Sequence, residues 1–374
     1  MNNAIPHVRR IGSRIARALF SDSGSNAVAP SSVSGAVDET WGLSPREEYD
    51  LLVRNCQQHM VPVTQPLVFI SQIQRSGGTL LSQLFDHHPQ CHAHPFEFKI
   101  NHPDTHVWPK IDLAAGHNEW FRVLFEHETI EHLKYGYKKT GSGTVNDHDR
   151  FRFPFLPSIQ KAVFEHYVYT HEMTNERAVF DCLMTSYFNA WLDNQNLFAG
   201  SKKYVTAFSS HMHGRMENFE RFFAVYPDGY LIRSIRDPRS WWASAKHQES
   251  RQLPNTFAEA LDVWKQSSSL TLELLKRYPD RTYLLTFEQL VGDTERTMRD
   301  LAAFLGIDFL PILTEPTFNG LPIRANSSFA VKEHGTISEP LERYKNVLSA
   351  EETAHIERNA LSLYDEVCTR LGRS

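Results

Sequence analysis

The sequence predicts an α/β fold of three layers, in which helices cover both faces of a central, mostly parallel sheet. Four short apolar runs lack polar alternation, which is typical of strands buried on both faces; they span 66–70, 204–208, 229–235 and 282–286. A pattern with helical spacing follows each run. Strands that alternate with helices in this way favour a parallel sheet covered on both sides.

Capping signals mark the ends of several expected helices. Ser44, Pro45 and Glu47 form a capping box that begins a helix running to about Cys56. Gly306 is placed to end another helix in the left-handed conformation. One helix is expected to begin at Gly77 and to end before Pro89. Further helices are expected at 175–194, 215–225, 239–247, 257–278, 293–305 and 349–371.

Composition and charge exclude several classes of protein. The chain has 374 residues, 41% hydrophobic and 22% charged, which provides ample material for a sizeable core. Its net charge of −5 indicates no general attraction to nucleic acid, so any bound anion needs a local basic site. No run of about 18 apolar residues is present, so no transmembrane helix is expected.

The four cysteines predict neither a disulfide framework nor a zinc site, since none of them forms a C-x-x-C pair. They are Cys56, Cys91, Cys182 and Cys368. A reducing compartment fits this usage, so we expect a cytoplasmic protein that holds no metal.

Residues 1–43 differ from the rest and are interpreted as a flexible basic tail and linker. Arg9, Arg10, Arg14 and Arg17 have no acidic neighbour before a Ser/Gly/Ala-rich stretch at 21–37. A frayed terminus is the simpler interpretation. Weak membrane-surface contact through 5–20, or a transit peptide, is the alternative. Residues 44–374 then form the main domain, within which 101–170 has no clear period and is interpreted as an insertion carrying acceptor specificity.

A strand, a glycine turn and a helix follow one another at Arg75-Ser76-Gly77-Gly78-Thr79. The first N–H groups of a helix lack partners and carry partial positive charge, so they attract anions. Glycines let the backbone wrap closely around a tetrahedral anion, and the hydroxyls and the guanidinium add donors. The segment lacks the lysine of the Walker pattern G-x-x-x-x-G-K-[ST]. We therefore expect an anion cradle that works without a metal.

A second basic site is expected where the strand 229–235 runs into a helix. Arg236 lies at the strand end, Pro238 is suited to the first helical position, and Ser244 follows eight residues after Arg236. Ser244 then lies about two helical turns in, and it meets Arg236 only if the strand end folds across the helix.

The first of these segments resembles the 5′-phosphosulfate loop of sulfotransferases that use 3′-phosphoadenosine-5′-phosphosulfate (PAPS). In that family a basic residue precedes Ser-Gly-(Gly/Ser/Thr)-Thr and two apolar residues, here Leu80 and Leu81. Cytosolic members usually have lysine and tryptophan where this chain has Arg75 and Leu80. The arginine form is similar to bacterial carbohydrate and tyrosylprotein sulfotransferases. The resemblance implies a P-loop-like fold and the co-substrate PAPS, with its desulfated form PAP as product.

Two further segments extend the resemblance. Arg236 and Ser244 match the family's 3′-phosphate motif position by position, which implies that they bind that phosphate. Asn326-Ser327-Ser328-Phe329 looks like the loop that lays an aromatic residue, here Phe329, against the adenine. The expected third phosphate ligand has no match, and Arg324, Lys332 and Gly335 are the nearby candidates.

Sulfuryl transfer needs a base to take the proton of the acceptor, and two residues compete for that role. Glu97 lies in a Pro-x-Glu-aromatic context that resembles bacterial carbohydrate sulfotransferases. The flanking Phe96 and Phe98 would raise the pKa of Glu97 if they surrounded its carboxyl group. His211 follows the strand 204–208, as the histidine base of cytosolic sulfotransferases does, but Ser209 and Ser210 replace the usual Lys-Thr. We favour Glu97; His94 and His213 are weaker alternatives.

The leading hypothesis is a PAPS-dependent sulfotransferase that acts by in-line displacement. Arg75 and the helix start would stabilise the charge on the leaving nucleotide. Its acceptor would be a hydroxyl or amine, on a carbohydrate or small metabolite. A nucleotide kinase on a similar sheet is one alternative, and a non-catalytic nucleotide-binding protein is another. Neither the acceptor nor the oligomeric state can be inferred from the sequence.

Overall fold

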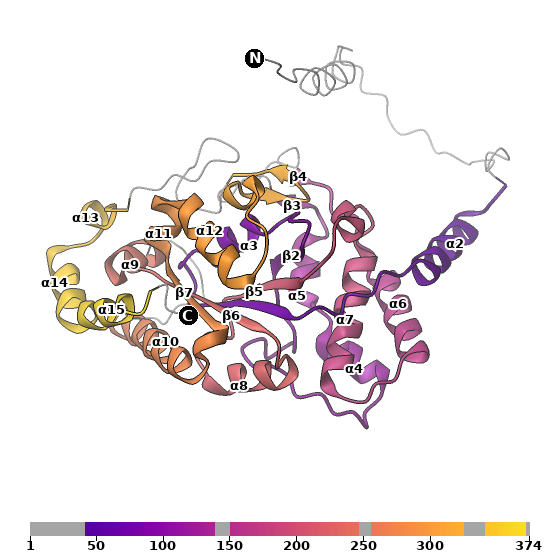
Figure 1. Cartoon of the computed structure of the whole chain (residues 1–374), viewed down its shortest axis with the longest axis horizontal. Coiled ribbons are helices and arrows are strands. Elements are labelled where there is room, and N and C mark those ends of the chain that lie inside the picture. The colour runs from indigo at the N-terminus through magenta and orange to yellow at the C-terminus, as the bar shows by residue number, and fades with distance from the viewer. Residues whose placement is uncertain (1–41, 139–149, 247–255, 325–340, 372–374) are drawn as a thin grey trace, which may run out of the picture. The chain divides into compact units, whose positions relative to one another are not determined.

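A computed structural model describes residues 42–138, 150–246, 256–324 and 341–371. Its centre is a five-stranded sheet in the order β2-β5-β1-β6-β7, with every neighbouring pair parallel (Figure 1). The strands are β1 Leu67–Ser71, β2 Cys91–Glu97, β5 Tyr204–Ser209, β6 Tyr230–Ile235 and β7 Thr282–Thr286. The four predicted strands are therefore confirmed, each within one residue at either end.

The two faces of the sheet pack against different helices, which confirms the predicted three-layer α/β class. Alternate residues of β1 point to opposite faces. Val68 and Ile70 pack on α3 (Gly78–Leu84) and α12 (Thr294–Leu305). Leu67 and Phe69 join the cluster of α7 (Glu176–Ala190) and α8 (Met216–Val225). Apolar residues on both faces explain why β1 has no polar alternation.

The remaining helices of the second half lie close to the predicted ranges. They are α9 Pro238–Lys246 and α10 Phe257–Arg277. The short α11 (Phe287–Gly292), which lies between β7 and α12, was not predicted. Gly306 ends α12 with φ 63°, as its sequence position predicted. The expected continuous helix at 349–371 is wrong, because Ala360 leaves helical geometry and divides it into α14 Ala350–Asn359 and α15 Leu361–Cys368. The short α13 (Tyr344–Val347) precedes them.

Strand β2 was not predicted. Glu97 is the last residue of this edge strand. The strand contains two histidines and Pro95, which weaken a strand pattern. Its register with β5 shifts between Ala93 and Glu97, and such irregular edge positions are where a strand tolerates proline.

Several small elements lie in the region 101–170. They are α4 His117–Leu124, α5 His127–Leu133, α6 Pro157–Thr170 and a hairpin of β3 Tyr137–Lys138 with β4 Arg150–Phe151. Beyond the region, β8 Thr317–Phe318 pairs with β9 Leu321–Pro322. The insertion's role in acceptor specificity stays a prediction.

The tail 1–41 lies outside the described residues, so its interpretation is not tested. Contacts divide the chain into a short unit ending at Tyr49 and a main unit, Asp50–Ser374. Helix α2 (Pro45–Gln58) starts at the expected capping box, in which Ser44 N donates to Glu47 Oε2 at 2.7 Å. Among the described helices, none combines the length and the apolar character needed to cross a membrane.

Candidate active site

The glycine loop joins the carboxyl end of β1 to α3, as predicted. Arg75 and Gly77 adopt positive φ angles of 67° and 88°, which turn the chain sharply into the helix. A Cβ on Gly77 would lie 2.7 Å from the ring of Phe287, and one on Gly78 would lie 1.8 Å from Gln72 Nε2. Both glycines are thus needed for close packing, and no side chain caps the start of α3.

Ser76 supplies a buried hydroxyl whose Oγ has no hydrogen-bond partner among the described residues. Its carbonyl oxygen accepts from Ser234 Oγ at 2.6 Å, which fixes the loop on β6. Thr79 is partly exposed at the first turn of α3, whereas Leu80 is buried in the core beneath it. An unsatisfied buried hydroxyl beside uncapped N–H groups fits an oxyanion ligand.

The structure brings the second basic site into contact with the first. Arg75 Nε donates to Ser244 Oγ at 3.2 Å, and Arg236 Nη1 donates to the carbonyl oxygen of Arg75 at 3.0 Å. The Arg236 guanidinium lies over the ring of Phe287 at 4.0 Å. Arg236 and Ser244 are both buried. Arg75 after β1, Arg236 after β6 and Ser244 of α9 therefore form one connected cationic site, in which Arg236 and Ser244 are each linked to Arg75.

Two buried tryptophans hold the backbone of this cationic site. Trp241 Nε1 donates to the carbonyl oxygen of Gln74 at 2.9 Å, and Trp264 Nε1 donates to that of Arg236 at 3.2 Å. Trp241 is thus a packing residue of the core cluster that also contains Ile73 and Ile235.

The two base candidates lie side by side at the carboxyl ends of β2 and β5. His211 Nε2 is 3.6 Å from Glu97 Oε1. The same carboxylate oxygen accepts from the backbone N–H of Ser210 at 3.0 Å and from its hydroxyl group. Sequence reasoning treated Glu97 and His211 as competitors. It could not place them together, because strand β2 was missed.

The phenyl rings beside Glu97 do not surround its carboxylate, which corrects the expected apolar setting. Phe98 is buried in the core, and the ring of Phe96 stacks on His132 at 4.7 Å. Neighbouring side chains of a strand point to opposite faces, so adjacency in sequence gave the wrong surroundings. The surroundings of Glu97 Oε1 are polar donors instead.

His211 is buried and its ring packs 4.9 Å from that of His106. Burial lowers the pKa of His211, while the charge of Glu97 opposes that shift. The imidazole is therefore neutral near pH 7 and can accept a proton. His213 fits this role less well, because burial lowers its pKa to about 3. His94 pairs with the buried Glu126 at 3.0 Å and has a structural role.

Lys99 also lies beside Glu97 and His211, although no sequence pattern predicted this. Its Nζ lies 3.5 Å from Glu97 Oε2 and 3.0 Å from Glu128 Oε2. Burial alone would raise the pKa of Glu128, but the hydrogen bond from Lys99 and the charges of Lys99, His211 and His102 together outweigh burial and lower the pKa. The surface beside Glu97 and His211 is therefore charged and polar.

Phe329, Lys332 and Gly335 lie outside the described residues, so the expected adenine contact and two candidate phosphate ligands are not tested. Among the described residues, no group of three or more His, Cys, Asp or Glu side chains is placed to hold a metal ion.

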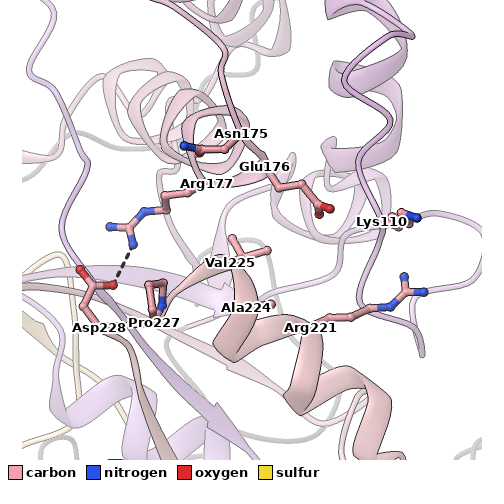
Figure 2. A pocket seen from close by; sticks show the side chains of 9 residues that line it. All are labelled: Lys110, Asn175, Glu176, Arg177, Arg221, Ala224, Val225, Pro227 and Asp228. Carbon is pink, nitrogen blue, oxygen red and sulfur yellow. Dashed lines mark hydrogen bonds and ion pairs between the residues drawn. The ribbon is translucent and has the colours of Figure 1, made fainter.

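A pocket of about 700 Å³ lies elsewhere, at the amino ends of the strands (Figure 2). Asp228, two residues before β6, lines it together with Arg177 and Arg221. Arg177 is paired with Asp228 at 2.9 Å. None of the predicted site residues lines this pocket. The anion loop and the base candidates are at the opposite, carboxyl edge of the sheet, where ligands of open α/β sheets bind.

A model of the sulfotransferase family matches residues 66–311, about two thirds of the sequence. The chain belongs to the sulfotransferase family. No curated protein matches this sulfotransferase significantly.

Three solved structures illustrate what the sulfotransferase is similar to. The sulfotransferase domain of the curacin biosynthetic pathway is 18% identical with a TM-score of 0.44, covering 80% of this chain and 98% of that one. The sulfotransferase domain of the Synechococcus PCC 7002 olefin synthase is 16% identical, with a TM-score of 0.42 and coverage of 79% and 95%. Mouse sulfotransferase SULT7A1 complexed with PAP is 11% identical, with a TM-score of 0.38 and coverage of 86% and 94%.

Proposed function

We propose that this sulfotransferase moves a sulfuryl group from PAPS to a hydroxyl or amine group of an acceptor. The observation that carries this proposal is the joining of Arg75, Arg236 and Ser244 into one cationic site beside the anion loop. A nucleotide with phosphates at both ends needs two linked anion sites. A single glycine loop would suffice for a simple phosphate.

The reaction would be an in-line displacement at sulfur. The bond between the acceptor oxygen and sulfur forms as the bond from sulfur to the bridging oxygen breaks, and PAP leaves. The uncapped N–H groups of α3, Ser76 and Arg75 would stabilise charge on the departing phosphate. The proton of the acceptor passes to a base. In this proposal the site would supply both the charge stabilisation and a proton acceptor.

Glu97 is the proposed base, and His211 is the proposed residue that orients it. Glu97 Oε1 is held by Ser210, and its side chain is 17% exposed against 5% for His211, so it is the more open to an acceptor. The charged side chains of Lys99 and Glu128 beside Glu97 favour a hydrophilic acceptor such as a carbohydrate over an apolar one. We further propose a cytoplasmic location, since the cysteines suit a reducing compartment.

Calorimetry and thermal melts with PAP, ATP and NAD test the proposed ligand. We expect PAP to bind and to stabilise the protein, by about 2.7 kcal/mol at a concentration of 100 times its Kd. Arg236→Ala should weaken PAP by about 2 kcal/mol or more, because a charge-assisted contact is lost from a buried site. Arg221→Ala, which removes an arginine from the remote pocket, is the matched control and should bind PAP normally.

Failure of the wild-type protein to bind PAP at millimolar concentration would refute the proposal. A response to ATP with Mg²⁺ in place of PAP would support the kinase alternative. PAP binding without transfer to any acceptor would support a non-catalytic nucleotide-binding protein.

A further inference from the structure

Arg233 is a buried arginine that the proposed reaction does not use. It lies on β6, three residues before Arg236, and is 1% exposed. Nε donates to Thr271 Oγ1 at 3.1 Å, and Nη2 donates to the carbonyl oxygen and the hydroxyl group of Ser267, each at 3.1 Å. Nη1 donates to the carbonyl oxygen of Ser71. All of these acceptors are neutral.

No carboxylate of the described residues pairs with this guanidinium, and no other described group offers it a negative charge. Burial lowers the pKa of Arg233 to about 9, so the side chain is still charged at neutral pH. His213 also interacts electrostatically with Arg233, but burial lowers its pKa to about 3 and leaves it neutral. A buried charge without a counterion disfavours folding even where its hydrogen bonds are made. The ring of Phe219 lies 5.2 Å from the guanidinium and offsets part of this cost. The free protein therefore contains a core cation that no described anion balances.

This cation is hydrogen-bonded to the strand residue from which the anion loop begins. Strands β1 and β6 are paired up to Ile70 and Ile232, so Ser71 and Arg233 are the next residues on each strand. Ser71 is the last residue of β1, and the loop to Gly77 begins immediately after it. The hydrogen bond from Arg233 to Ser71 thus connects the guanidinium to the first residue before the loop.

We propose that the anionic groups of the bound nucleotide are the counterion of Arg233, which makes it a positioning residue whose charge favours the nucleotide-bound state. This inference rests on the proposed binding of PAPS. Arg233 lies three residues before Arg236, which at the rise of an extended strand is roughly 10 Å. At that separation and an effective dielectric constant of about 20, attraction to one unit charge corresponds to about a tenfold gain in affinity. The same charge opposes folding when the nucleotide is absent.

A matched pair of variants separates the charge of Arg233 from its hydrogen bonds. Arg233→Lys keeps the charge and Arg233→Gln removes it, while both lose part of the guanidinium contacts. PAP and adenosine, which has the same nucleoside without phosphates, are titrated into each variant by calorimetry. We expect Arg233→Gln to bind PAP about tenfold more weakly than Arg233→Lys, with equal adenosine binding. Without ligand, Arg233→Gln should melt no lower than Arg233→Lys.

Equal PAP affinity of the two variants would overturn the inference, as would an equal loss of PAP and adenosine binding in Arg233→Gln. The second result would show that Arg233 acts through its hydrogen bonds alone. If Arg233→Gln fails to fold, Arg233→Met tests the same loss of charge with an apolar side chain. Wild-type protein that binds no PAP would refute the proposed function and this inference with it, whereas wild-type binding with equal variants would refute this inference only.

Discussion

At the scale of single residues, the carboxylate of Glu97 is held by two residues that follow a different strand, β5, and by one that follows its own strand, β2. Ser210 donates to Glu97 Oε1, Lys99 lies beside Oε2, and His211 is 3.6 Å away. Such a carboxylate is fixed in orientation while remaining partly exposed. Orientation of the proton acceptor is what general-base catalysis requires, because the base must lie within hydrogen-bond reach of the proton it removes.

Replacement of each member of the pair should separate their roles. We expect Glu97→Gln to lower kcat about 100-fold or more with PAP affinity unchanged, because the amide cannot accept the acceptor's proton. His211→Asn should lower kcat less, since it removes only a neighbour of the base. Transfer of a radiolabelled sulfuryl group from PAPS to a panel of sugars, phenols and amines measures both.

Glu295→Gln is the control for that comparison. Glu295 is an exposed carboxylate of α12 that pairs with Arg299 at 2.6 Å, on a helix that carries none of the proposed site residues. It should keep most of the activity. A larger loss in His211→Asn than in Glu97→Gln would assign the proton transfer to the histidine.

At the scale of elements, β1, the glycine loop and α3 form one unit whose packing is as demanding as its ligand chemistry. Gly78 is enclosed by the side chains of Gln72 and Phe208, so α3 packs against them more closely than a residue with a Cβ atom would allow. Gly77 likewise allows Phe287 of α11 to approach the loop. The pattern of two glycines therefore reflects close approach of neighbouring elements in addition to space for an anion.

Gly78→Ala should destabilise the protein by about 2 kcal/mol, because its methyl group would lie 1.8 Å from Gln72 Nε2 and 2.2 Å from the Phe208 ring. Chemical denaturation followed by circular dichroism measures the free energy of unfolding. Gly214→Ala is the control, since nothing lies within 4 Å of the position its Cβ would take. Equal stability of the two variants would show that α3 can move away from the sheet at little cost.

At the scale of the whole molecule, the sheet gathers the site from distant parts of the sequence. Arg75 and Ser244 lie 169 residues apart and are hydrogen-bonded. All five strands of the sheet are parallel, so their carboxyl ends lie at one edge. That topology brings together the loop after β1, the two base candidates at the ends of β2 and β5, and Arg236 after β6.

Much of this arrangement could be predicted from the sequence, for identifiable physical reasons. Strands β1, β5, β6 and β7 are buried and apolar, which gives a clear signal. Strand β2 gave none, because an edge strand with histidines and a proline has no such pattern. Without β2, the contact between Glu97 and His211 could not be predicted either.

Arg233 could not be recognised as buried from the sequence either. A lone arginine within an apolar run indicates a solvent-facing position more often than a core one. Its burial depends on Ser267 and Thr271, which α10 brings from more than 30 residues away. Long-range polar contacts of this kind leave no local pattern.

The C-terminal helices are tied to the site through Glu352, which connects α14 to α9, the helix that carries Ser244. Glu352 Oε1 accepts from Trp242 Nε1 at 3.0 Å and from Lys246 Nζ at 2.9 Å. Burial would raise the pKa of Glu352, but hydrogen bonds from Ser349, Trp242 and Lys246 outweigh it and lower the pKa to about 2. The ionised carboxylate therefore stabilises the folded state.

The sign of this pKa shift predicts a pH-dependent effect of Glu352→Gln on the stability of the whole molecule. A carboxyl group with a lowered pKa in the folded state contributes stability above its unfolded pKa of about 4.3, and loses it as pH falls towards about 2. Solvent screening limits the contribution to about 1 kcal/mol at pH 7. Glu352→Gln should therefore melt below the wild type at pH 7, and the difference in melting temperature should shrink by more than half at pH 3.

Glu357→Gln, which removes the exposed partner of Arg239, is the control and should change little at either pH. A gap for Glu352→Gln that stays constant from pH 7 to pH 3 would show that the carboxylate's charge does not hold α14 against α9.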